Sequence, residues 1–223
     1  MTLRELYNQL NEKYGRINAR DTVDVFTDKG SVHTYIEFYE SYFEPFQKKV
    51  SLLEIGLMTG GSLYLWKNYF TKFKLVGLDI TKTWSSARPF QAEVENDPDI
   101  KLCFGIDSTD PVEIPNLNDQ KFDFIIDDGN HRRASQLATF TNYYPMLETG
   151  GTYFIEDIEG DMGELFTIIE KLGILSNDEY RITIYVGDVQ KRKDDQILAI
   201  TKLKPSASYV TSYARQILQY KKK

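Results

Sequence analysis

The sequence has little cysteine, little histidine and no long apolar run. Its 223 residues include one cysteine, Cys103, and two histidines, so no disulfide can form within the chain. Residues 1–15 place apolar and charged residues at helical spacing and lack the apolar run that a signal peptide needs. No stretch approaches the length of a membrane span. We therefore expect a cytoplasmic protein with no membrane partner, in which Cys103 is a buried strand residue.

A basic surface is also missing. The chain carries 33 acidic and 27 basic residues, for a formal net charge of -6. A nucleic-acid partner requires a basic face that neutralises phosphates. The basic runs at 191–193 and 221–223 are short and are typical of solvated loops or tails. The composition therefore argues against binding to nucleic acid.

What is present is an alternation of apolar runs and helical segments in a chain that is 41% hydrophobic. This rhythm predicts a parallel sheet covered by helices. The expected strands are 50–55, 74–80, 100–106, 122–126 and 152–155, followed by an antiparallel edge hairpin of 181–186 and 197–203. The predicted fold class is α/β: a Rossmann-like, doubly wound, mostly parallel seven-stranded sheet with a C-terminal hairpin and an N-terminal helical lid.

The expected helices are 3–10, 31–49, 62–70, 134–147, 161–172 and 209–220. Gly150 and Gly151 are expected to end the helix 134–147. The aromatic-rich segment 31–49 is expected to pack on the sheet, and it could also serve an interface in a homo-oligomer. We expect one domain over 1–223, made of an N-terminal helical covering segment, 1–49, and a sheet core, 50–223.

Acidic residues follow every predicted parallel strand. In open parallel sheets, ligands bind outside the carboxyl ends of the strands. One or two acids there would be ordinary loop residues or helix caps, but the full set predicts one acidic cleft. These acids are Glu54, Asp79, Asp107, Asp127, Asp128, Glu156 and Asp157.

The first predicted strand leads into a glycine-rich turn of the form E-x-G-x-x-x-G-G. Glu54 begins this pattern, and Gly56, Gly60 and Ser62 follow it. A dinucleotide site would read G-x-G-x-x-G, and an acid would repel its pyrophosphate. The same acid suits a cofactor with an amino group or a sulfonium charge, which favours S-adenosylmethionine over NAD. Asp79 lies about 20 residues further on, where a carboxylate binds a ribose diol; the alternative is a loop cap.

The segment 122–131 places two acids three and four residues before His131. Carboxylates suit a hard divalent ion such as Mg²⁺, which would stabilise a substrate alkoxide. His131, with an ordinary pKa of about 6.5, could accept the hydroxyl proton. The alternatives are that Asp128 caps the next helix and that His131 is a surface residue. Since adjacent strand residues point to opposite faces, Glu156 and Asp157 can share one ion only if the chain has left the pleat.

Four stretches together resemble a known family. LLEIGLMTGGSLYLW, VGLDI, FDFIIDDGNH and GGTYFIEDI, in this order and spacing, resemble the metal-dependent sugar O-methyltransferases of the macrocin (TylF-like) type. These are class I S-adenosylmethionine-dependent enzymes. The resemblance runs from about Tyr14 to Asp157 and includes 27–31 and His33, which look like the family's cofactor-covering segment.

The resemblance assigns roles to particular residues. It implies that His131 is the general base and that Asp128, Glu156 and Asp157 bind the metal. It implies that Asp79 binds the ribose and that Asp107 and Ser108 lie near the adenine. The remaining cofactor-binding residues that it implies lie in the covering segment or near the methionine end: Lys29, His33, Glu54, Gly56, Gly60, Ser62 and Asp127.

Two departures from the family pattern stand out, and several functions stay open. Residues 16–26 look inserted before the covering segment, and Asn130 replaces a more usual serine.

The expected function is Mg²⁺-dependent methylation of a hydroxyl on a sugar or a related small molecule. The alternatives are a methyltransferase for a catechol-like or amine acceptor, a non-catalytic S-adenosylmethionine-binding module, and an NAD-dependent oxidoreductase.

Overall fold

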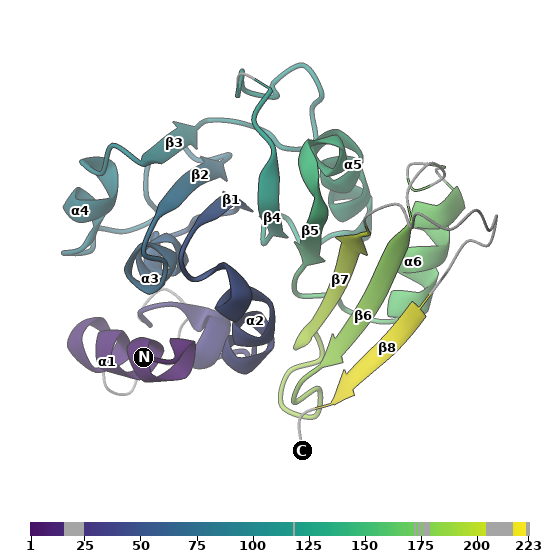
Figure 1. Cartoon of the computed structure of the whole chain (residues 1–223), viewed down its shortest axis with the longest axis horizontal. Helices are drawn as coiled ribbons and strands as arrows, with labels where there is room; N and C mark the ends of the chain where they lie inside the picture. Colours follow the sequence, from purple (N-terminus) through teal and green to yellow (C-terminus); the bar gives the residue numbers. More distant parts are fainter. Residues whose placement is uncertain are drawn as a thin grey trace. The chain divides into compact units, whose positions relative to one another are not determined.

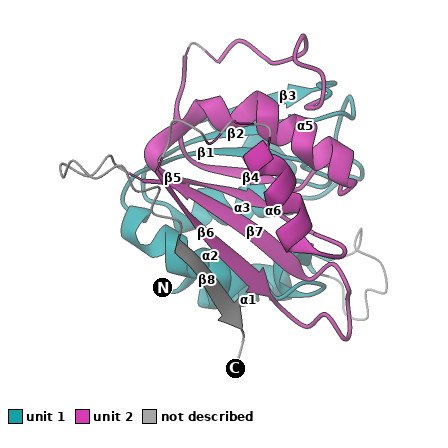
Figure 2. Cartoon of the chain, turned by 90° about the vertical axis from the view of Figure 1, so that its right-hand side faces the viewer, with its two compact units in different colours: residues 1–107 teal, residues 108–223 magenta. Residues whose placement is uncertain are grey.

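The computed structural model describes residues 1–15, 25–117, 119–171, 173, 175 and 179–203, and the backbone of 216–221. The chain divides into two compact units, Met1–Asp107 and Ser108–Lys223 (Figure 2). Most of the apparent insertion at 16–26 lies outside the described residues, as does most of the expected helix 209–220. Each unit is described separately below.

The first unit contains three parallel strands in the order β3-β2-β1 (Figure 1). They are β1 (Val50–Ile55), β2 (Phe73–Asp79) and β3 (Ile100–Phe104). Leu52 pairs with Leu75, and Leu75 pairs with Ile100, so apolar side chains align across the sheet. All three strands lie within one residue of their predicted starts. Because the strands are parallel, the residues that follow them meet at one edge.

In the described part of the first unit, α-helices and 3₁₀ segments precede or connect these strands. The α-helices are α1 (Leu3–Tyr14), α2 (Ile36–Phe43), α3 (Gly61–Tyr69) and α4 (Gln91–Glu95), and the 3₁₀ segments are η2 (Asp28–Gly30) and η3 (Glu44–Phe46). A capping box between Thr2 and Glu5 begins α1, which buries Leu3, Leu6 and Tyr7. These helices confirm the predictions for the N-terminus and for 62–70.

The prediction of one helix over 31–49 was wrong. The helix α2 covers only Ile36–Phe43, and the short 3₁₀ segment η3 follows it with Pro45 in its first turn. Proline lacks the N–H that an α-helix needs and clashes with the preceding turn, so the helix stops before it. The aromatic face still packs inward, because Phe38, Tyr39 and Phe43 are buried.

The second unit combines parallel and antiparallel strands in the order β4-β5-β7-β6-β8. Their bounds are β4 (Phe122–Asp127), β5 (Leu147–Ile155), β6 (Tyr180–Val186), β7 (Gln196–Lys202) and β8 (Gln216–Lys221). β4 and β5 are parallel, whereas β7 runs antiparallel to both β5 and β6. The seven strands β1 to β7 and the antiparallel hairpin confirm the predicted fold class.

Three details of the second unit differ from prediction. Residues 216–220 belong to a strand that pairs with β6, so they are not part of a closing helix and the hairpin is not at the edge. The helix α5 (Arg133–Tyr143) ends at the 3₁₀ segment η4 (Tyr144–Met146), which contains Pro145. Gly150 and Gly151 therefore do not end that helix; they lie within β5.

The remaining helix, α6 (Met162–Lys171), buries Met162, Leu165, Phe166 and Ile169. Strands β4 and β5 end in nearly continuous buried runs, as expected for central parallel strands. Cys103 is half-buried instead of buried, and the partial burial raises the pKa of its thiol. Among the described residues, no helix is long and apolar enough to cross a membrane.

Candidate functional site

The turn after β1 adopts backbone conformations that favour glycine. Gly56 and Gly60 have φ angles of 89° and 81°, and Gly60 is the N-cap residue of α3. A Cβ on Gly61 would lie 1.8 Å from the backbone oxygen of Phe26. Gly60 and Gly61 are therefore required for different reasons. Gly60 adopts the positive φ that the turn needs, and Gly61 leaves room for the backbone of the covering segment. Ser62, in the first turn of α3, is buried.

Asp79 holds this turn in place. Its Oδ2 accepts hydrogen bonds from the backbone N–H groups of Leu57, at 2.8 Å, and Met58, at 3.2 Å. Its Oδ1 accepts from the N–H of Thr81 at 2.8 Å and from the Thr81 hydroxyl at 2.6 Å. In this structure the carboxylate that was expected on a ribose thus caps loop N–H groups, as the alternative prediction for Asp79 has it, and it orders the glycine turn.

Two further residues support the turn, and sequence reasoning missed both. The side-chain amide of Gln91 donates to the backbone oxygens of Thr59, at 2.9 Å, and Ser86, at 2.8 Å. The Trp84 ring packs so closely on Gly60 that an added Cβ would lie 2.6 Å from it. A single glutamine or tryptophan in a polar segment carries no periodic signal, so only the tertiary structure reveals these contacts.

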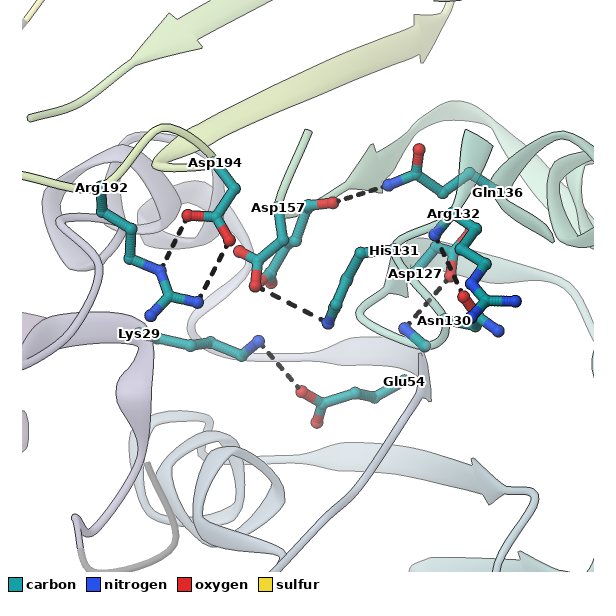
Figure 3. A network of polar contacts seen from close by, with 12 residues as sticks. Lys29, Glu54, Asp127, Asn130, His131, Arg132, Gln136, Asp157, Arg192 and Asp194 are labelled. Atoms are coloured by element: carbon teal, nitrogen blue, oxygen red, sulfur yellow. Dashed lines mark hydrogen bonds and ion pairs between the residues drawn. The ribbon is translucent and has the colours of Figure 1, made fainter. Parts of the chain in front are cut away.

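A buried ion pair joins the covering segment to the end of β1. The Nζ atom of Lys29 lies 3.7 Å from Oε1 of Glu54, and neither side chain is exposed (Figure 3). The indole N–H of Trp66 donates to Oε2 of Glu54 at 3.2 Å. His33 is also buried and stacks on Tyr35. Lys29, His33 and Glu54, which were expected near the cofactor, are thus held within the interior of the first unit.

Asp107 and Ser108 are half-buried and follow β3. The Ser108 hydroxyl shares a hydrogen bond of 3.0 Å with the hydroxyl of Thr139 on α5. The side-chain amide of Asn142, also on α5, donates to the backbone oxygen of Ser108 at 2.9 Å. The structure therefore fixes Ser108 to α5 and does not place Asp107 in the acidic cluster described next.

The second unit brings Asp128, His131 and Asp157 together. One ligand atom from each lies within 4.8 Å of the others, a spacing that one metal ion can bridge. The Nε2 atom of His131 is 3.7 Å from Oδ2 of Asp157 (Figure 3). The His131 side chain is 45% exposed and that of Asp157 is 5% exposed, so a solvent-facing imidazole meets a buried carboxylate.

The chain leaves the pleat of β5 at this cluster. The N–H of Glu156 still donates to the backbone oxygen of Asp127 at 3.0 Å, continuing the ladder between β5 and β4. Asp157 then has a φ of 52°, in the left-handed region. Glu156 is buried and lies outside the described cluster. The chain thus leaves the strand pleat, as it must if Glu156 and Asp157 are to share one ion. In this structure, however, only Asp157 of these two acids joins the cluster.

Asp127 is a buried carboxyl group at the end of β4. Its Oδ1 accepts a hydrogen bond from the N–H of Gly129 at 3.3 Å, and its Oδ2 makes none within the described residues. Burial, with a smaller contribution from the neighbouring Asp128, raises the pKa of Asp127 to about 8. An unpartnered buried oxygen costs free energy unless a ligand supplies a donor.

Asp128 does not cap the helix that follows. The N-cap residue of α5 is Arg132, and no side-chain hydrogen bond caps this helix. The alternative role considered for Asp128 is therefore not supported. The two carboxylates of the cluster are oxygen donors of the kind that Mg²⁺ and Mn²⁺ prefer, whereas the imidazole of His131 is not a preferred Mg²⁺ ligand. Asp128 and Asp157 thus fit the predicted metal, and His131 stays available as a proton acceptor.

Comparison with known proteins supports the resemblance. No family model matches the chain. The chain is 33% identical over 143 residues to the Streptomyces olivaceus 2'-O-methyltransferase of 8-demethyl-8-alpha-L-rhamnosyl tetracenomycin-C, covering 60% of this chain and 35% of that protein. It is 32% identical over 139 residues to the Streptomyces fradiae demethylmacrocin O-methyltransferase, covering 58% and 33%. The chain thus spans about a third of the length of these relatives.

A solved structure extends the likeness to nearly the whole chain. The MycE methyltransferase of mycinamycin biosynthesis, in complex with Mg and S-adenosylhomocysteine, matches with a TM-score of 0.64 and 22% identity, over 95% of this chain and 58% of MycE. The chain has the MycE methyltransferase fold. The predicted Rossmann-like methyltransferase fold is confirmed, and so is the resemblance to sugar O-methyltransferases of the macrocin type.

Proposed function

We propose that this chain is an S-adenosylmethionine-dependent, Mg²⁺-dependent O-methyltransferase that acts on a hydroxyl of a sugar or a glycosylated natural product. The observation that carries the proposal is that Asp128 and His131, which follow β4, lie close to Asp157, which follows β5. The relatives named above are O-methyltransferases by name, and they match about 60% of this chain. We further propose that 1–223 acts as one methyltransferase domain, in which 1–49 covers the cofactor.

We assign cofactor binding to the turn after β1 and to its neighbours. S-adenosylmethionine supplies the methyl group as a sulfonium. Gly56, Gly60 and Ser62 would approach its methionine end, where the N-terminus of α3 offers backbone N–H groups to the carboxylate. Glu54 would face the ammonium group and Asp79 the ribose. In the second unit, we assign Asp127 to the methionine moiety. Asp107 and Ser108 would lie near the adenine. Lys29 and His33 would bind the cofactor from the covering segment, 1–49.

The second unit would provide the acceptor side. Asp128 and Asp157 would hold the divalent ion, and Glu156 can join them only if its side chain turns toward the cluster. When bound, the ion lowers the pKa of the acceptor hydroxyl and stabilises its alkoxide. Among the described residues, His131 combines exposure with a place in the cluster, which suits a proton acceptor for an external substrate.

The proposed reaction balances with these groups. Nε2 of His131 accepts the hydroxyl proton, and the carboxylate of Asp157 stabilises the resulting imidazolium. The acceptor oxygen forms a bond to the methyl carbon while the bond from carbon to sulfur breaks. The products are a methyl ether, S-adenosylhomocysteine and a protonated His131, which loses its proton to solvent. Alignment of the two reactants would provide much of the acceleration.

An assay of S-adenosylhomocysteine release tests this proposal. The chain would be incubated with S-adenosylmethionine and a panel of rhamnosides, other glycosides, catechols and amines, with Mg²⁺ or with EDTA. We expect turnover on a glycoside that EDTA abolishes and Mg²⁺ restores. Turnover confined to amines and insensitive to EDTA would favour the alternative acceptor class. Cofactor binding without turnover or any response to metal would favour a non-catalytic module. The cytoplasmic location and the absence of a nucleic-acid partner remain predictions.

A further inference from the structure

Asp157 lies between two residues that are each held by a glutamine side chain. On its N-terminal side, the Nε2 of Gln136 donates to the backbone oxygen of Glu156 at 3.0 Å (Figure 3). On its C-terminal side, the Nε2 of Gln196 donates to the backbone oxygen of Ile158 at 2.8 Å. The two glutamines come from different elements, α5 and the start of β7, so the turn at Asp157 is fixed from two directions.

This turn needs support because its backbone is unfavourable. A left-handed conformation is uncommon at residues other than glycine, although asparagine and aspartate adopt it more readily than most, and it persists only where its surroundings determine it. Asp157 has a φ of 52°. A side chain moves with its backbone, so a relaxed turn would redirect the carboxylate away from Asp128 and His131.

Gln196 makes the more extensive set of contacts. Besides Ile158, its Nε2 donates to the backbone oxygen of Lys193 at 3.1 Å. Its own backbone oxygen accepts from the N–H of Ile158 at 3.4 Å. Gln196 therefore ties the turn after Asp157 both to β7 and to the connection 187–195. Gln136 is buried, and its helix begins two residues after His131.

We propose that Gln136 and Gln196 are positioning residues that set the Asp157 carboxylate for ion binding before the ion arrives. This inference rests on the proposed metal site. An amide can donate to backbone oxygens without adding charge near the carboxylates, which neither lysine nor glutamate can do. Supporting residues around metal ligands commonly change metal affinity by about 10–100-fold.

The first unit offers a matched control. Gln91 makes the same kind of bridge, since its Nε2 donates to the backbone oxygens of Thr59 and Ser86 beside the glycine turn. Gln→Met removes the amide with little change in length at all three positions. Loss of the amide donors beside Asp157 should weaken metal binding, whereas loss of the Gln91 amide should weaken cofactor binding.

The test is a pair of titrations on the full chain: Mn²⁺ binding by electron paramagnetic resonance and S-adenosylhomocysteine binding by calorimetry. Gln136→Met and Gln196→Met should weaken Mn²⁺ binding about 10–100-fold and leave the cofactor affinity within about twofold of wild type. Gln91→Met should do the reverse. Gln196→Leu also removes the donor without adding charge, so it should weaken Mn²⁺ binding too and replaces the methionine variant if that fails to fold.

The outcomes separate the inference from the proposed function. If the wild type binds Mn²⁺ and the Gln136 and Gln196 variants bind it equally well, the inference is wrong and the metal site stands. Equal losses of metal and cofactor affinity, together with a lower Tm, would show a merely structural role and also overturn it. A folded wild type that binds no divalent ion would overturn the proposed metal site and the inference together.

Discussion

The Nε2 atom of His131 lies 3.7 Å from Oδ2 of Asp157. Under the proposed function, this one carboxylate would contribute to an ion site with Asp128 and would also stabilise a positive charge on the imidazole. Asp157 is nearly buried, whereas His131 reaches solvent, where an acceptor would arrive. This asymmetry makes His131 the residue whose removal should affect chemistry and little else.

Replacing His131 with alanine should lower turnover at least about tenfold, and by about 10²–10⁴-fold if proton transfer limits the rate. The affinity for S-adenosylhomocysteine should not change. Both are measured by steady-state release of product on the best glycoside and by calorimetry. Arg132→Ala, at the exposed neighbouring position, is the control and should retain turnover. An unchanged rate in His131→Ala would remove this residue from the mechanism.

Asp127→Asn should make the ligand-free protein more stable at alkaline pH. The folded-state pKa of Asp127, about 8, lies above its ordinary value, so the folded protein holds this proton more tightly than the unfolded chain. Ionisation of the buried Asp127 therefore costs no stability below about pH 4, where the group is protonated in both states, an increasing amount up to pH 8, and a constant amount above.

The gain from Asp127→Asn should follow the same window and reach the order of a few kcal/mol above pH 8. Urea unfolding in EDTA at a series of pH values measures it. A difference between variant and wild type that does not change between pH 5 and pH 8.5 would contradict the assigned cause.

The buried pair of Lys29 and Glu54 should show strong coupling. Lys29→Met and Glu54→Gln should each reduce the free energy of unfolding by about 3–5 kcal/mol. Each change removes one charge of the ion pair and leaves the opposite charge buried in the protein interior. The double variant should lose clearly less than the sum, since neither charge then remains. Urea unfolding of the four proteins measures the coupling, and additive losses would mean that the two residues do not depend on each other.

Gly61→Ala should destabilise the first unit because its Cβ would lie 1.8 Å from the Phe26 backbone oxygen. We expect a loss of about 1–3 kcal/mol, typical of overpacking, and weaker binding of S-adenosylhomocysteine. Gly105→Ala is the comparison: its Cβ would meet nothing within 4 Å, so only its φ of 75° opposes alanine. Gly105→Ala should therefore leave cofactor affinity unchanged. Equal cofactor affinities in both variants would show that the packing of Phe26 on Gly61 does not support the turn.

Much of the fold could be predicted because its signals are local and periodic. Apolar runs placed β1 to β7, the glycine pattern placed the turn after β1, and the acids at the strand ends pointed to the region in which Asp128, His131 and Asp157 gather. The helix over 31–49 was overestimated because the aromatic spacing continues past Pro45. The strand at 216–221 was mistaken for a helix because a short polar and apolar segment fits either period.

What could not be predicted depends on contacts between segments distant in sequence. Nothing in the pattern around Asp79 shows that its carboxylate receives hydrogen bonds from the glycine turn. Nor does the pair Glu156 and Asp157 indicate which of them turns into the cluster; the left-handed φ of Asp157 decides that. The side chains of Gln136, Gln196 and Gln91 donate to backbone oxygens that only the tertiary structure brings near them.

The most direct test of the account is an anomalous difference map from crystals grown with Mn²⁺ and S-adenosylhomocysteine. The account predicts a single strong peak within bonding distance of carboxylate oxygens of both Asp128 and Asp157, with His131 beside it. A peak elsewhere on the protein, or none at this cluster at saturating Mn²⁺, would contradict the claim that these carboxylates hold the ion for methyl transfer.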